Sequence, residues 1–191
     1  MKRLGVFCGS SPGVSPEFTD AARELGQLMA DRNIELVFGG SHVGMMGVVA
    51  DAVLAGGGSV IGVLPRFMQE KELAHTGIST LHLVDTMHER KQRMAELSEG
   101  FVALPGGFGT FEEIFEAITW GQLHLHEYPC GLLNVCGYFN SLVEFIKPAV
   151  ASGFVKQSQL DALVVALHPW SCWNGLLRSP RTVPRSGIQQ N

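Results

Sequence analysis

Glu113 and Arg90 are the two charged residues whose positions in the sequence suggest catalysis or ligand binding. Glu113 closes the stretch PGGFGTFEE (105–113), in which three glycines come just before a helical pattern. Arg90 follows Met87 by three residues and precedes Met94 by four, so it shares the inward face of a predicted helix. An inward arginine needs a carboxylate or a phosphate as its partner. We expect Arg90 to contact a ligand, to hold Glu113 ionised, or to form a structural salt bridge.

The same stretch also offers a structural explanation for Glu113. The run from Thr110 to Glu113 fits the capping box T-x-x-E, in which the glutamate carboxylate folds back onto the cap N–H. Glu112 and Glu116 are four residues apart and could share a solvated helix face. Glu113 would, however, lie in the first turn of a helix whose N-terminus faces a ligand. Capping and chemistry therefore both remain open for this residue.

Three glycine-rich turns each follow a strand-like run: Gly9–Gly13, Gly39–Gly47 and Pro105–Thr110. In a parallel sheet the carboxyl ends of all strands lie at one edge, where open α/β sheets bind their ligands. Glycine lets the backbone approach a ligand closely, and helix N-termini favour anions. The glycines could serve only tight turns, but three such turns at one edge favour a phosphorylated ligand.

Two common nucleotide motifs are missing from these turns. A P-loop requires G-K-[ST], which the chain lacks, and CGSSPG after the first strand does not fit G-x-G-x-x-G. Phe38-Gly39-Gly40 stands where an acidic residue would bind the ribose of NAD. ATP hydrolysis and hydride transfer are disfavoured, and a nucleoside monophosphate or a sugar phosphate remains.

Alternating strands and helices must position these residues. Continuous apolar runs predict strands at 3–8, 34–38, 59–64, 80–84, 100–104 and 131–135. The run at 162–167 could be a last strand, but it is too short for periodicity to separate strand from helix. Helical patterns occupy 15–33, 44–55, 85–98, 111–123 and 140–153. This alternation predicts an α/β fold, a doubly wound parallel sheet with helices on both faces. We expect a single domain over residues 1–178 and a disordered tail over 179–191.

The predicted helix after PGGFGT carries an apolar stripe at Phe111, Ile114, Phe115 and Ile118. The spacing i, i+3, i+4 and i+7 is typical of a helix face that packs on a core. The stripe is broad and aromatic, so a dimer interface could share it.

Composition excludes several classes of protein. The chain has 191 residues, 46% hydrophobic and 17% charged, as expected for a globular domain with a full-sized core. A net charge of -4 argues against a nucleic-acid-binding surface. No apolar run approaches the roughly 20 residues that a membrane-spanning helix needs. The N-terminus does not resemble a signal peptide, so we expect no membrane partner and a cytoplasmic location.

The metal-binding residue types are not spaced for a metal site. Cys8, Cys130, Cys136 and Cys172 form no C-x-x-C pair, and we expect reduced, mostly buried thiols. His124 and His126 are two residues apart and would point in different directions on a helix. We expect neither a metal nor a cofactor.

Two motifs resemble those of a known family. PGGFGTFEE (105–113) matches the PGGxGTxxE signature of the LONELY GUY family, also labelled "possible lysine decarboxylase", and MHERK (87–91) matches its second signature. CGSS, the glycine-rich run after the second strand and GLLNVCGY (131–138) agree in kind and order. The resemblance runs from about Leu4 to about Phe154.

The resemblance implies a Rossmann-like homodimer that hydrolyses cytokinin riboside 5'-monophosphates, and also AMP, to free base and ribose 5-phosphate. It makes Arg90 and Glu113 the catalytic pair. The implied and inferred substrate-binding residues are Ser10, Gly40, Glu72, Arg90, Lys91, Gly106, Gly107, Phe108, Gly109, Thr110, Phe111, Glu112, Glu113 and Thr119. No residue pattern marks the pyridoxal phosphate lysine of a decarboxylase.

The chain departs from the family pattern at four positions. Ser41 and His42 follow Gly40 where a third glycine is common, Tyr128 replaces a frequent lysine, and Cys136 replaces a frequent aspartate. These changes bear on base preference and loop contacts. The alternative function is a non-catalytic nucleotide or molybdenum-cofactor carrier on the same scaffold, which would need the anion site but not the Arg90–Glu113 pair.

Overall fold

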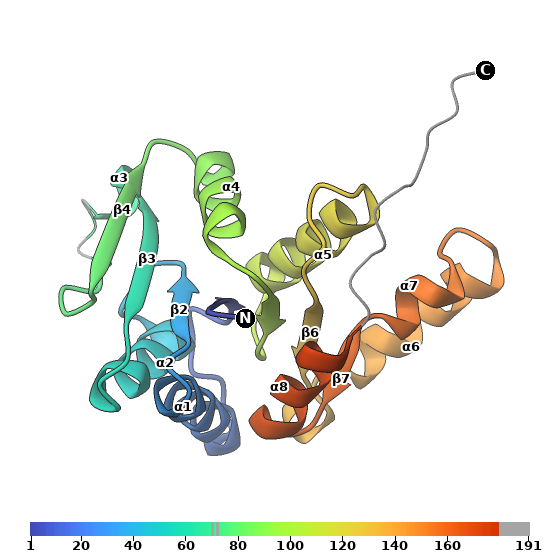
Figure 1. The fold of residues 1–191 in the computed structure, drawn as a ribbon, viewed down its shortest axis with the longest axis horizontal. Coiled ribbons are helices and arrows are strands. Elements are labelled where there is room, and N and C mark those ends of the chain that lie inside the picture. The colour runs from blue at the N-terminus through green and yellow to red at the C-terminus, as the bar shows by residue number, and fades with distance from the viewer. Residues whose placement is uncertain (70, 72, 180–191) are drawn as a thin grey trace.

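Seven strands form one parallel sheet in the order β4-β3-β2-β1-β5-β6-β7 (Figure 1). The computed structural model describes residues 1–69, 71 and 73–179. All six neighbouring pairs of strands are parallel. The strands are β1 Arg3–Phe7, β2 Glu35–Phe38, β3 Val60–Pro65, β4 Thr80–Val84, β5 Phe101–Ala103, β6 Cys130–Leu133 and β7 Val164–Ala166. Each strand predicted from an apolar run is present.

Helices cover both faces of this sheet. They are α1 Pro16–Asp31, α2 Gly44–Ala55, α3 Arg66–Gln69, α4 Met87–Leu97, α5 Phe108–Gln122, α6 Asn140–Ala151, α7 Gln157–Asp161 and α8 Pro169–Arg178, with a 3-10 turn η1 at Val135–Gly137. In Figure 1, α4 and α5 lie above the sheet and α1, α2 and α8 lie below it. The doubly wound α/β architecture is confirmed.

Both faces of the central strands are buried, which explains why their sequences are continuously apolar. In β2, Leu36 and Phe38 belong to the core beneath α1 and α2, while Val37 belongs to the core beneath α4 and α5. Successive side chains of a strand point to opposite faces, so a sheet covered twice needs apolar residues at every position.

Three helices were not predicted from the sequence, and one of them, α3, is only four residues long. α7 is five residues long, too short to give a periodic signal. α8 begins with Pro169 at its first position and buries Cys172, Trp173 and Leu176. The helical spacing of these apolar residues and the proline at the helix start are both sequence signals from which α8 could have been predicted.

The capping explanation for Glu113 is wrong. α5 begins at Phe108 rather than at Phe111, with Gly107 as its N-cap and no side-chain capping bond. The N–H of Phe111 already donates to the Gly107 carbonyl at 3.1 Å, so Thr110 lies inside the helix and cannot cap it. Glu113 is therefore available for another role.

α4 does begin with a side-chain cap. The N–H of Glu89 donates to the Thr86 hydroxyl oxygen at 3.1 Å, while the Glu89 carboxylate accepts from the N–H of Asp85 at 2.9 Å. Two N–H groups at this helix start are thus satisfied, and the position of Arg90 one residue later is fixed.

Two predictions fall on residues that the structure does not describe. The expected disordered tail lies outside the described residues apart from Ser179, and so does Glu72.

The expected thiols are described: the four cysteines are free, and Cys136 alone among them is exposed. Burial raises the pKa of both Cys130 and Cys172 to about 12.

Candidate active site

A cavity of about 270 Å³ lies at the carboxyl ends of β1 and β5, where the strand order reverses direction. Such a switch point is the usual ligand site of an open parallel sheet. Its lining comes from strand ends, glycine-rich turns and two helix starts: Val6, Phe7, Cys8, Gly9, Ser10, Gly39, Met46, Met87, Arg90, Met94, Gly107, Phe108, Gly109, Thr110, Glu112 and Glu113.

The three glycine-rich turns meet at this cavity, as predicted from their positions after parallel strands. The N–H of Gly9 donates to the Pro105 carbonyl at 3.1 Å, which joins the turns after β1 and β5. The N–H of Met45 donates to the Gly9 carbonyl at 3.0 Å, which joins the start of α2 to the turn after β1. Backbone bonds therefore fix the three turns relative to one another.

The N-terminus of α5 opens into the cavity. Phe108, Gly109 and Thr110 form its first turn, and all three line the cavity. The first N–H groups of a helix have no partner within the helix, and the helix dipole makes this end electropositive. The cavity therefore contains a site suited to an anion such as a phosphate.

Arg90 and Glu113 form an almost buried ion pair beside that anion site. The Arg90 Nη1 donates to Glu113 Oε1 at 2.6 Å, and the side chains are 8% and 11% exposed. The Arg90 Nε also donates to the Val63 carbonyl at 3.2 Å. The arginine is thus anchored to the end of β3, and its partner is the glutamate that the spacing suggested.

Gly39 makes room for this arginine. A Cβ atom at Gly39 would lie 2.0 Å from the Arg90 Nη2, a distance at which the two atoms overlap. The glycine at the end of β2 is therefore needed for the close approach of a side chain. The sequence signals this contact only through the glycine-rich turn itself, because the close approach of Arg90 depends on the tertiary fold.

Burial raises the pKa of the Glu113 carboxyl, and the Arg90 guanidinium opposes that shift by its charge and its hydrogen bond. The expectation that Arg90 keeps Glu113 ionised is therefore right in direction, but burial outweighs it. A carboxylate with a raised pKa is a better proton acceptor than an ordinary surface glutamate.

Cys8 lies beside the pair and was not singled out from the sequence. It lines the cavity, and burial, followed by the nearby Glu113 charge, strongly raises the pKa of its thiol. Since the thiolate is the reactive form, Cys8 is an inert part of the wall and not a nucleophile.

Lys91 lies outside the cavity lining and holds two glutamates of α5. Its ammonium pairs with Glu112 and, at 3.1 Å, with Glu116. Burial alone would lower the pKa of Lys91, but the bonds to these carboxylates outweigh it and raise the pKa. The prediction that Glu112 and Glu116 share one helix face is confirmed, although Lys91 covers that face. Glu112 also lines the cavity.

One wall of the cavity is apolar. Met46 and Met94 are buried, Met87 is 41% exposed, and Phe108 is 92% exposed at the mouth. Met87 was expected on the inward face, and it faces the cavity instead of the core. Methionine side chains adapt readily to flat or irregular apolar ligands.

The structure brings together Ser10, Arg90, Gly107, Phe108, Gly109, Thr110, Glu112 and Glu113 from the predicted set. Gly40 packs against Leu64 and Leu81 beneath the rim, and Gly106 packs against Thr110. Phe111 packs against the core beneath α5. The Thr119 hydroxyl donates to the Phe115 carbonyl at 2.7 Å on an exposed part of α5. These four, with Lys91, do not line the cavity of a single chain.

The described part of the chain holds neither a metal-binding cluster nor a membrane-spanning helix. Among those residues, no group of three or more His, Cys, Asp or Glu side chains is arranged to hold a metal ion. Over the same residues, none of the helices combines the length and the apolar character needed to cross a bilayer.

The sheet order and the cavity at its switch point place the chain among the doubly wound α/β proteins, which bind ligands at that position. A family model described as "Possible lysine decarboxylase" matches residues 46–175. The chain belongs to this family and, within it, to the LONELY GUY group that the sequence motifs indicated.

The similar curated proteins are named as phosphoribohydrolases. Cytokinin riboside 5'-monophosphate phosphoribohydrolase LOG3 of Arabidopsis thaliana is 47% identical over 165 residues, which cover 86% of this chain and 77% of that protein. The probable enzyme of the same name, LOGL2 of Oryza sativa subsp. japonica, is 48% identical over 88% of this chain and 69% of its own length.

Similar solved structures include molybdenum-cofactor proteins. The molybdenum cofactor binding protein of Rippkaea orientalis has a TM-score of 0.70 and 22% identity, covering 90% of this chain and 93% of that one. The Moco carrier protein of Chlamydomonas reinhardtii has the same TM-score and identity, covering 92% and 95%. At this identity the likeness shows a common fold.

Proposed function

We propose that this protein hydrolyses the N-glycosidic bond of cytokinin riboside 5'-monophosphates, and of AMP, to release the free base and ribose 5-phosphate. The observation that carries the proposal is the almost buried Arg90–Glu113 pair beside the N-terminus of α5. The names of relatives at 47% and 48% identity support the same reaction.

The 5'-phosphate binds at the start of α5. The N–H groups of Phe108, Gly109 and Thr110 and the Thr110 hydroxyl donate to its oxygens, and Ser10 adds a contact from the turn after β1. A phosphate held there places the ribose along the cavity toward Glu113, one turn further along the same helix.

Glu113 acts on the anomeric carbon. As the bond from C1' to the base nitrogen breaks, its electron pair leaves with the base and positive charge develops on the ribose. The Glu113 carboxylate stabilises that charge and accepts a proton from the water whose oxygen bonds to C1'. That proton then passes from Glu113 to the departing base, so the carboxylate is regenerated and free base and ribose 5-phosphate are the only products. Arg90 orients the carboxylate throughout.

The base occupies the apolar wall. Met46, Met87 and Phe108 offer flat and flexible contact area beside the ribose site. An adenine, with or without an apolar substituent on its amino group, suits such a wall.

Glu72, Lys91 and Thr119 remain predicted ligand contacts on the strength of the family motifs.

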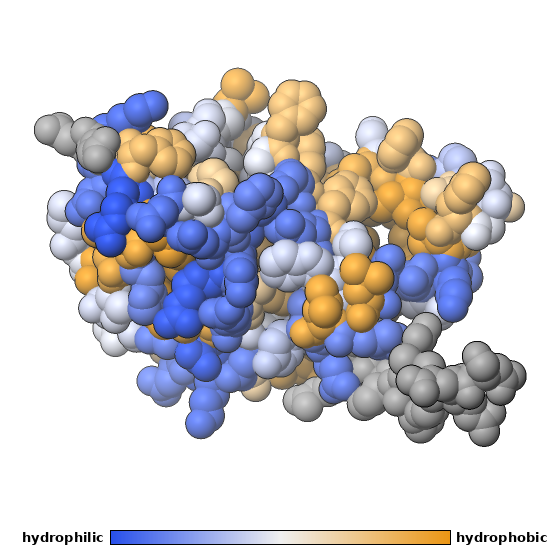
Figure 2. All heavy atoms as spheres, turned by 90° about the horizontal axis from the view of Figure 1, so that it is seen from above, coloured by the Kyte–Doolittle hydropathy of each residue, from blue (hydrophilic) through white to orange (hydrophobic). Residues whose placement is uncertain are grey.

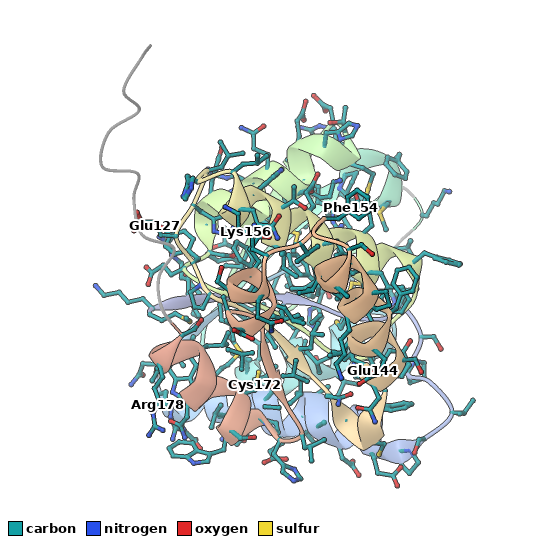
Figure 3. The ribbon with its side chains drawn as sticks, turned by 90° about the vertical axis from the view of Figure 1, so that its right-hand side faces the viewer. Glu127, Glu144, Phe154, Lys156, Cys172 and Arg178 are labelled. Atoms are coloured by element: carbon teal, nitrogen blue, oxygen red, sulfur yellow. The ribbon has the colours of Figure 1, made fainter. Side chains whose placement is uncertain are left out.

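We also propose that two copies associate, as the family resemblance implies, and that α6 rather than the stripe on α5 forms the interface. None of the described residues of α6 is buried, although the helix is amphipathic in sequence. Phe145 is 78% exposed and Phe154, just beyond its end, is 88% exposed. In Figure 3, α6 carries the labelled Glu144 and runs along the outer face toward the labelled Phe154. Seen from above, hydrophobic side chains gather over α5 to α7, whereas the surface over α4 is mostly hydrophilic (Figure 2).

An apolar surface of this kind is uncommon on a monomer and is typical of an interface. Action in the cytoplasm remains a prediction from the sequence.

The test of the reaction is direct. Purified protein is incubated with AMP and, separately, with isopentenyladenosine 5'-monophosphate, and free base and ribose 5-phosphate are separated by chromatography. Equal amounts of the two products support the proposal. A folded protein that releases base from neither nucleotide would favour the carrier alternative, which needs the anion site but not the ion pair.

A further inference from the structure

Tyr138 contacts the anion-binding loop from outside the cavity. Its hydroxyl donates to the Gly106 carbonyl oxygen at 2.5 Å, across 32 residues of sequence. Tyr138 is absent from the cavity lining, while Gly107, on the other side of the same peptide bond, is part of it. We propose that Tyr138 is a positioning residue, which holds the Gly106–Gly107 peptide so that its N–H faces the phosphate. The inference rests on the proposed function of this cavity.

The geometry of the peptide bond links the Tyr138 contact at the Gly106 carbonyl to the direction of the Gly107 N–H. In a trans peptide the carbonyl oxygen and the N–H point in opposite directions. With the Gly106 oxygen bonded to Tyr138, the Gly107 N–H points away from the tyrosine, to the side where Gly107 lines the cavity. A fourth N–H then joins those of the first turn of α5.

The peptide needs such an external restraint because glycine stands on both sides of it. Two glycines allow the peptide plane to rotate at little steric cost. A rotated peptide would turn the Gly106 oxygen into the anion site and repel a phosphate. The hydroxyl of Tyr138 favours the orientation that binds and disfavours the one that repels.

Aromatic neighbours hold the tyrosine ring in place. The rings of Tyr138 and Phe111 are 6.5 Å apart and nearly parallel, at 24°. Phe18 of α1 approaches at 5.8 Å and Phe139 at 5.0 Å, both edge to face. These contacts restrict the ring from three sides, so its hydroxyl has a fixed position relative to the start of α5.

The turn after β6 directs Tyr138 toward the loop. The side chain of buried Asn134 accepts from the N–H of Phe139 at 2.7 Å and donates to Asn140 at 2.8 Å. Cys136 and Gly137 both have positive φ, at 52° and 73°, which reverses the chain within a few residues. β6 neighbours β5 in the sheet, so this turn lies beside the loop that it supports.

The test is Tyr138→Phe, which removes the hydroxyl and keeps the ring contacts. Calorimetry with ribose 5-phosphate should show binding weakened about fivefold, the typical effect of one hydrogen bond. With AMP, KM should rise by a similar factor while kcat stays nearly unchanged. Hydrolysis of adenosine, which lacks the phosphate, should not respond. Tyr128→Phe is the matched control, since it removes the hydroxyl of the chain's other tyrosine, which is exposed and does not line the cavity, and it should bind ribose 5-phosphate as the wild type does.

The outcomes separate this inference from the proposed function. Equal affinity of the wild type and Tyr138→Phe for ribose 5-phosphate overturns the inference, even if AMP is hydrolysed. An equal loss of activity on AMP and adenosine also overturns it, since a merely structural defect affects both. A fivefold binding difference without any hydrolysis upholds the role of Tyr138 and refutes the proposed reaction.

Discussion

Arg90 and Glu113 place an almost buried charge pair where a phosphorylated ligand would bind. Arg90 is fixed from two sides, by the Val63 carbonyl and by the Glu113 carboxylate. A side chain held in this way loses little further entropy when the substrate binds, so its orientation is already set. In the proposed reaction Arg90 would therefore aim Glu113 as well as balance its charge.

Gly39 gives the first residue-scale prediction. Gly39→Ala should displace Arg90, because the added Cβ would lie 2.0 Å from its guanidinium. We expect kcat/KM for AMP to fall by about a hundredfold, the scale of a misplaced catalytic group. The matched control is Gly77→Ala, whose Cβ would approach no atom closer than 3.4 Å. A fully active Gly39→Ala protein would mean that the position of Arg90 does not govern catalysis.

The pH dependence of kcat tests the state of Glu113. In the proposed reaction the carboxylate is the active form, and burial raises its pKa above the ordinary value of 4.5. As the pH falls, the active form should therefore be lost sooner than it would be for a surface glutamate. The acid limb of the kcat profile should have its midpoint above 4.5, with circular dichroism confirming that the protein stays folded. A midpoint at or below that value contradicts the assignment.

Among the structural elements, the turn after β6 shows how local strain supports the site. Cys136 has φ 52° and ψ 23°, in the left-handed region that most side chains avoid. Aspartate and asparagine tolerate this region better, which gives a physical reason for the aspartate that is common in the family at this position.

Cys136→Asn should accordingly stabilise the protein. We expect the free energy of unfolding to rise by about 0.5 kcal/mol, part of the usual cost of left-handed backbone. Denaturant unfolding followed by fluorescence measures the change. Cys136→Ser is the control, since serine lacks the preference, and a serine variant as stable as the asparagine variant would refute the explanation.

Much of the element order could be predicted because the central strands are covered on both faces. Their apolar runs are continuous, and the glycine-rich turns mark the strand ends at the cavity. The start of α5 could not be predicted correctly, since T-x-x-E at 110–113 imitates a cap while the helix starts from Gly107 without one. The roles of Gly39 and Tyr138 depend on contacts across the fold that no local pattern records.

At the scale of the whole molecule, the residues that the structure describes leave the outer face of α6 uncovered. The exposed aromatic residues on and after α6, Phe145 and Phe154, are large and close in sequence. A helix with an unburied apolar face is stabilised when a partner covers it. The proposed dimer would give α6 the packing that the single chain does not supply.

Phe145→Glu should therefore dissociate the dimer. Light scattering on the wild-type protein should give twice the mass of one 20.7 kDa chain, and the variant should give the mass of one chain. Leu177→Glu is the control, because it places the same charge at an exposed position of α8. A wild-type monomer, or a variant that remains dimeric, would exclude α6 as the interface.

The central claim is that Glu113 breaks the glycosidic bond in the cavity at the start of α5. The most direct measurement is kcat for isopentenyladenosine 5'-monophosphate with Glu113→Gln beside the wild type and Glu116→Gln. Glu116 lies one turn further along α5, pairs with Lys91 and does not line the cavity. We predict a loss of about a thousandfold for Glu113→Gln, within the usual range for a proton-accepting group, and near wild-type activity for Glu116→Gln. Equal activity of Glu113→Gln and the wild type would contradict the account.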